Sequence, residues 1–71
     1  MVYVKFKEKF HGVNVKGIYL KKHKSVSEAK RNIARWNSLN PSRDRIIVLG
    51  MYKEKPIGFI KTRFPNMWKK R

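Results

Sequence analysis

The first residues of the chain alternate between apolar and polar positions. Val2, Val4 and Phe6 occupy every second position, with a tyrosine or a lysine after each of them. A period of two is typical of a strand that has one buried and one exposed face. Residues 9–12 read as a turn, in which Gly12 is free to adopt a positive φ. We therefore expect a strand that begins at Val2 and ends before this turn.

A second strand is expected over residues 13–22. Its apolar residues change phase partway along, and Gly17 stands at the change, so we expect a β-bulge there. With one extra residue at the bulge, the two strands share an outward face that combines lysines with tyrosines. This face is predicted to carry Tyr3, Lys5, Lys7, Asn14, Lys16, Tyr19 and Lys21.

The next segment has the pattern of an amphipathic helix. Ser25 and Glu28 have capping-box spacing, in which the hydroxyl and the carboxylate bond free backbone N–H groups of the first turn. Asn40 and Pro41 end the helix, because proline disfavours a helical residue before it. The expected apolar stripe consists of Val26, Ala29, Ile33, Trp36 and Leu39.

Two further strands are expected in the C-terminal part of the chain. Residues 45–52 are apolar in both phases, which is typical of a central strand covered on both faces. A turn at 53–56 leads to a fourth strand at 57–64, which Pro65 ends.

These elements predict an α+β fold with the order β-β-α-β-β. We expect a four-stranded, mainly antiparallel sheet with strand order 2-1-3-4 and the helix packed on one face. Residues 1–64 would form the single domain and residues 65–71 a basic C-terminal tail. The sheet face without a helix must be covered by the tail residues Phe64, Met67 and Trp68, be covered by a second subunit, or serve as a binding platform.

The charge of the chain changes this picture most. Nineteen Lys and Arg residues oppose four Asp and Glu residues, a net charge of +15 in 71 residues, while 41% hydrophobic and 13% aromatic residues favour a folded domain. Repulsion between so many positive charges opposes a compact fold. A bound polyanion reduces this repulsion, because Lys and Arg neutralise its phosphates and release its counterions. The alternative is a charge that only keeps the protein soluble. Lysines outnumber arginines, which favours contact with the phosphate backbone over base readout.

The sequence offers little for catalysis. There is no cysteine, the carboxylates lie in turns or at the helix cap, and the glycines form no phosphate-binding loop. His11 and His23 lie at opposite ends of a predicted strand, so a shared metal is not expected. We expect no enzyme, no cofactor and no metal. The longest apolar run, residues 46–51, is far shorter than the roughly 20 residues that span a membrane, so we expect a soluble, cytoplasmic protein without a membrane partner.

Three basic clusters are candidates for phosphate binding. They are the outward face of the first hairpin, where tyrosines could stack on bases, the helix with the segment that leads into it, and the tail. The second cluster also holds His23 and Asn32. For each cluster the alternative is an ordinary solvated surface. The candidate residues are Lys5, Lys7, Lys16, Tyr19, Lys21, Lys22, Lys24, Lys30, Arg31, Arg35, Lys69, Lys70 and Arg71.

The sequence therefore predicts a non-catalytic, regulatory protein, monomeric or homodimeric, that binds DNA or RNA. Phosphates would be contacted through the hairpin face and the helix face. The alternative is a small inhibitor or adaptor that docks on an acidic host or partner protein through the apolar third strand and Trp68, which resembles an interface anchor.

Overall fold

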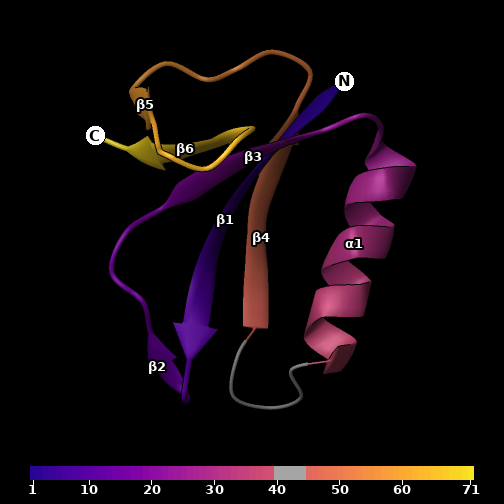
Figure 1. Ribbon diagram of the computed structural model, residues 1–71, viewed down its shortest axis with the longest axis vertical. Coiled ribbons are helices and arrows are strands. Elements are labelled where there is room, and N and C mark those ends of the chain that lie inside the picture. The colour runs from indigo at the N-terminus through magenta and orange to yellow at the C-terminus, as the bar shows by residue number, and fades with distance from the viewer. Residues whose placement is uncertain (40–44) are drawn as a thin grey trace.

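The computed structural model describes residues 1–39 and 45–71. Within these residues the chain forms a six-stranded antiparallel sheet and one helix (Figure 1). The α+β class is confirmed. The elements are β1 (Val2–Phe10), β2 (Val13–Asn14), β3 (Tyr19–His23), α1 (Val26–Leu39), β4 (Arg45–Tyr52), β5 (Phe59–Lys61) and β6 (Met67–Lys70). The expectation of four strands is wrong: the second predicted strand is divided into β2 and β3, and the C-terminal segment adds a further strand.

Strand β1 is the centre of the sheet. It pairs with β4 on one side and with β2 and β3 on the other, and β6 and then β5 follow β3. The first predicted strand is thus flanked by the second and third, as expected. However, β4 is an edge strand rather than a central one, and the C-terminal hairpin lies beyond β3, on the other side of the sheet. In Figure 1 this hairpin lies away from α1.

Strand β4 is apolar although it lies at the edge of the sheet. At one point a helix side chain makes the backbone hydrogen bonds that a neighbouring strand would otherwise make. Asn37 accepts a hydrogen bond from the Ile46 N–H through Oδ1 (2.9 Å) and donates one from Nδ2 to the Ile46 carbonyl (3.3 Å). Farther along the strand, Val48 and Leu49 are 39% and 42% exposed. The apolar run of β4 is therefore only partly covered.

The turn between β1 and β2 is the one expected. Phe10 pairs with Val13, so only His11 and Gly12 lie between the strands. Their φ values are 54° and 79°, the left-handed conformation of the two-residue turns that match the twist of a hairpin.

The interruption between β2 and β3 decides which side chains share a face. Residues 15–18 lie opposite Lys7 and Glu8 of β1, so the second strand gains two residues where one was expected. Gly17 has a φ of 112° at this interruption. An insertion of two residues keeps the phase of a strand, whereas an insertion of one reverses it.

The predicted outward face is therefore wrong for Tyr19 and Lys21. Each of these residues lies opposite a buried residue of β1, Phe6 or Val4, and directly opposed residues of antiparallel strands point to the same side. Leu20, expected on the side of the helix, points to the other face. We call the sheet face that carries Val4 and Phe6 the helix side, and the opposite face the open face.

The hydrophobic core on the helix side is small. Val2, Val4 and Ala29 form a buried cluster, and Ile33 and Met51 pack against it. Helix α1 contributes only one fully buried residue to this cluster. The other members of the predicted helix stripe, Val26, Trp36 and Leu39, are exposed.

The start of α1 depends on Ser25. Its Oγ accepts a hydrogen bond from the backbone N–H of Glu28 at 3.1 Å, as the capping spacing predicts. We expect Ser25→Ala to lower the free energy of unfolding by about 1 kcal/mol, because one N–H of the first turn loses its partner. Urea denaturation followed by circular dichroism measures this. Ser38→Ala, an exposed change at the other end of α1, is the control and should cost less than about half as much.

The C-terminal segment, expected as a tail, forms a hairpin with β5. The Thr62 N–H and hydroxyl both donate to the Met67 carbonyl, at 3.1 and 3.0 Å, and Lys61 Nζ donates to the Phe64 carbonyl at 2.6 Å. Asn66 has a φ of 58° in this turn, a conformation that asparagine tolerates better than most residues. Trp68 is thereby placed directly opposite Leu20.

The open face has its own buried centre. Leu20 is fully buried there, between Lys5 of β1 and Trp68 of β6. Tyr3 stacks on Trp68 with ring centroids 5.6 Å apart and planes 16° from parallel. The C-terminal hairpin thus covers part of the face that lacks a helix.

Candidate nucleic-acid interface

The structure distributes the predicted binding residues over several surfaces instead of joining them in one. Residue pairing and strand alternation separate the strand residues into two groups, one on each sheet face. The open face carries Lys5, Lys7, Lys22 and Lys70, and the helix side carries Tyr19, Lys21 and Lys69. Helix α1 carries Lys30, Arg31 and Arg35. Outside these elements, Lys16 lies between β2 and β3, Lys24 precedes α1, and Arg71 follows β6.

On the open face, the aromatic rings already have partners within the protein. Besides the stack of Tyr3 on Trp68, Lys61 Nζ lies 5.7 Å from the centroid of the Trp68 ring. Lys5 Nζ lies 5.6 Å from the centroid of the Tyr52 ring. These contacts stabilise the sheet. A base that stacked here would have to displace a lysine, so this face is the weaker candidate.

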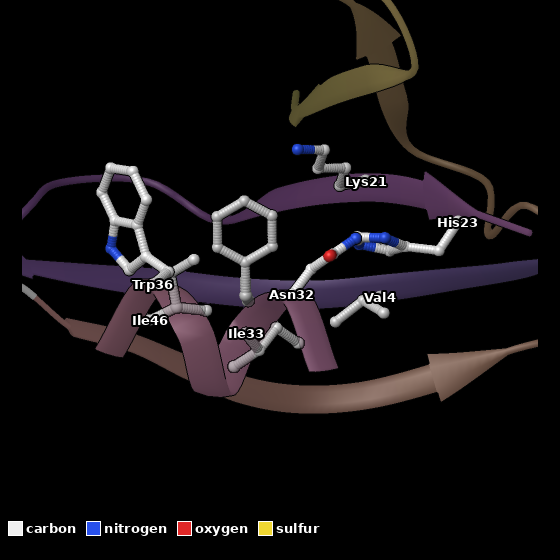
Figure 2. A pocket seen from close by; sticks show the side chains of 8 residues that line it. Val4, Lys21, His23, Asn32, Ile33, Trp36 and Ile46 are labelled. Carbon is white, nitrogen blue, oxygen red and sulfur yellow. The ribbon is translucent and has the colours of Figure 1, made fainter. Parts of the chain in front are cut away.

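On the helix side, a cavity of about 90 Å³ lies between α1 and the sheet. Its apolar walls come from Val4, Phe6, Ile33 and Ile46, and Trp36 lies at one end (Figure 2). Three polar side chains from β3 and α1, those of Lys21, His23 and Asn32, complete the lining.

These three polar side chains form the chemically distinctive edge of the cavity. Figure 2 shows the Asn32 amide beside the His23 ring, whereas Lys21, from the same strand as His23, directs its amine away from both. His23 is only 7% exposed. Within residues 1–39 and 45–71, no hydrogen bond engages any of the three side chains. The edge therefore offers unused donors and acceptors, which a ligand could satisfy.

Burial lowers the pKa of His23 from its ordinary value, and the positive charge of Lys21 lowers it further, while Glu28 acts in the opposite direction. The His23 ring is therefore held in its neutral form at pH 7, with one nitrogen as donor and the other as acceptor.

This pKa shift predicts a pH-dependent stability. Because the pKa of His23 is lower in the folded chain than in the unfolded chain, acid protonates the unfolded chain first. The free energy of unfolding should be constant above about pH 7 and fall as the pH drops below the unfolded value of about 6.5. Urea denaturation between pH 7.5 and pH 5 tests this, since His23→Asn should remove much of the fall. His11→Asn, which retains His23, should keep it.

Further cations and one more ring lie on the helix side of the sheet or on α1. Tyr19 stacks on Phe6 with centroids 6.0 Å apart, and Lys69 lies directly opposite Tyr19 in the sheet. On α1, Arg35 is three residues beyond Asn32 and four beyond Arg31, so it lies on a flank of the helix between them, whereas Lys30 faces elsewhere. We call Tyr19, Lys21, Arg35 and Lys69, together with the cavity, the helix-side surface. No salt bridge neutralises its cations within the described chain.

Sequence reasoning brought part of this surface together, because it grouped Lys21, His23, Asn32 and Arg35 in the second basic cluster, but it placed the other parts elsewhere. Phe6 and Trp36 were assigned to the core, and Tyr19 and Lys21 to the opposite face. His23 and Asn32 were recognised as members of the second basic cluster but not as binding residues. The available signal was the alternation of Lys21 with His23 in β3, which puts both on one side.

Other kinds of site find little support in the described chain. No three His, Cys, Asp or Glu residues of the described part come together as metal ligands. Helix α1 has 14 residues, and no described helix has the length and apolar character needed to cross a membrane. Comparison of the chain with protein-family models, curated proteins and solved structures finds no match.

Proposed function

We propose that this protein binds nucleic acid without catalysing a reaction and that the helix-side surface is its interface. Lys21, Arg35 and Lys69 would contact phosphates, and the net charge of +15 would attract the polyanion from a distance. Because the proposed partner is nucleic acid, the cytoplasm stays the proposed location.

The observation that carries this proposal is that Lys21 lines the cavity, while Tyr19 and Lys69 lie on the same face of the sheet and none of these cations has a carboxylate partner in the described chain. The cations come from three separate elements, β3, β6 and α1. Lysine and arginine beside exposed ring faces are the combination with which proteins bind nucleic-acid strands. Positive charge used only for solubility would not require this grouping.

A fluorescence-anisotropy titration at several salt concentrations tests the proposal. Single-stranded DNA, duplex DNA and duplex RNA are compared. Three neutralised phosphates predict a log–log slope of affinity against salt of about −2 on a single strand, or about a 20-fold loss between 50 and 200 mM salt. An affinity that is independent of salt, or absent for all three nucleic acids, would contradict the proposal.

The adaptor function has one observation in its favour, the uncovered edge of β4. Val48 and Leu49 are exposed there, and within the described sheet β4 pairs only with β1. Trp68, by contrast, is half-buried against Tyr3 and does not serve as a free anchor. An acidic protein that binds stoichiometrically, resists nuclease and is released by Val48→Lys would support this function. Loss of every partner on nuclease treatment would exclude it.

A further inference from the structure

The cavity of the helix-side surface is too small for an ordinary metabolite. Pockets for drug-sized ligands have volumes of about 300–1,000 Å³, whereas this cavity has about 90 Å³. An apolar cavity of about 150 Å³ accommodates one benzene molecule. The cavity is smaller than this but partly open to solvent, so a single six-membered ring can enter it only in part, with its substituents outside, and two fused rings are too wide.

The polar edge matches the hydrogen-bonding edge of a pyrimidine base. Lys21 supplies only donors, Asn32 supplies both donors and an acceptor, and the neutral His23 ring supplies one of each. Thymine and uracil present carbonyl acceptors beside an N–H donor, so the Asn32 amide and the His23 ring can each find a partner. The apolar walls contact the ring itself.

Other occupants satisfy only part of this site. An aromatic side chain of a protein partner would fit the walls but would offer few hydrogen-bond partners to His23 and Asn32. A phosphate group would suit Lys21 but not the apolar walls. A base within a duplex cannot reach a cavity between a helix and a sheet without leaving its stack.

We infer that this cavity binds one unpaired pyrimidine base of a nucleic-acid strand whose phosphates lie against Lys21, Arg35 and Lys69. The inference rests on the proposed function and adds base selectivity and a preference for single strands to it.

Strands that share one backbone isolate the contribution of the base. The probe is a fluorescein-labelled strand of about ten abasic deoxynucleotides, within the usual range of site sizes, with a thymidine, an adenosine or a further abasic unit at its centre. We expect thymidine to raise the affinity about tenfold above the fully abasic strand, as one bound base does in known stacking sites, and adenosine to raise it far less.

Two helix variants show whether the cavity is responsible. Asn32→Ala removes part of the polar edge at an exposed position, where alanine favours the helix, so the fold should be unchanged. This variant should lose most of the thymidine effect and retain the affinity for the abasic strand. Ser38→Ala, an exposed polar-to-alanine change on the same helix that does not line the cavity, should behave like the unchanged protein.

Each outcome decides the question. If thymidine gives no gain, if adenosine gives the same gain, or if Asn32→Ala keeps the full thymidine effect, the inference is overturned while nucleic-acid binding stands. If no strand binds at any salt concentration, the proposed function fails and the inference fails with it.

Discussion

Replacing Leu20 by alanine should destabilise the domain by about 2–5 kcal/mol, the cost of emptying a fully buried leucine position. Leu20 is 0% exposed and lies between Lys5 and Trp68 on the open face. A chain of 71 residues has a total stability of only about 4–10 kcal/mol, so the variant should be largely unfolded in modest urea. Urea denaturation followed by far-ultraviolet circular dichroism gives the difference in the free energy of unfolding.

Ile57→Ala is the control, because Ile57 is 96% exposed and its truncation should change the stability by less than about 0.5 kcal/mol. A cost below about 1 kcal/mol for Leu20→Ala would show that β6 does not cover the open face and that the C-terminal hairpin is not part of the folded domain.

The second large effect concerns charge. The triple variant Lys21→Gln, Arg35→Gln, Lys69→Gln removes the cations of the helix-side surface. At 0.1 M salt each phosphate contact on a single strand contributes about fivefold to the affinity, so loss of all three should weaken binding about 100-fold. The slope of log affinity against log salt should also become shallower by about 2. Anisotropy titrations with an oligothymidine measure both quantities.

The matched triple variant Lys7→Gln, Lys16→Gln, Lys30→Gln lowers the net charge by the same amount at sites outside the helix-side surface. It should weaken binding by less than about threefold, since only its contribution to the long-range field is lost. Equal losses in the two variants would mean that binding follows the net charge alone and that the helix-side surface has no special part in it.

The local elements could be predicted because each depends on neighbouring residues. The period of two at Val2, Val4 and Phe6 and the hydroxyl of Ser25 act over a few positions, and the structure confirms both. Gly12 likewise lies in the expected turn.

The sheet could not be predicted to the same depth. Strand pairing depends on contacts between distant residues, and the pairing of Leu20 with Trp68 spans most of the chain. Residues 67–70 show no clear alternation and read as a basic tail until β3 provides an edge for them. The sequence also could not distinguish one inserted residue from two near Gly17, and this single difference moved Tyr19 and Lys21 to the helix side.

The same difference explains why the candidate site was only partly foreseen. The cavity is lined by Lys21 and His23 of β3 and by Asn32 of α1, and the predicted phase of the strand had turned Lys21 away from the helix. Composition identified the class of partner that we propose. To locate the proposed interface on the surface, the register of the strands had to be known as well.

The most direct test of a nucleic-acid interface on the helix side is a titration of the ¹⁵N-labelled protein with oligothymidine, followed by ¹H–¹⁵N correlation spectra at low salt. We predict that the largest shift changes occur at Lys21, His23, Asn32 and Arg35. Changes concentrated at Tyr3, Lys5 and Trp68, or no changes at a saturating concentration, would contradict this interface.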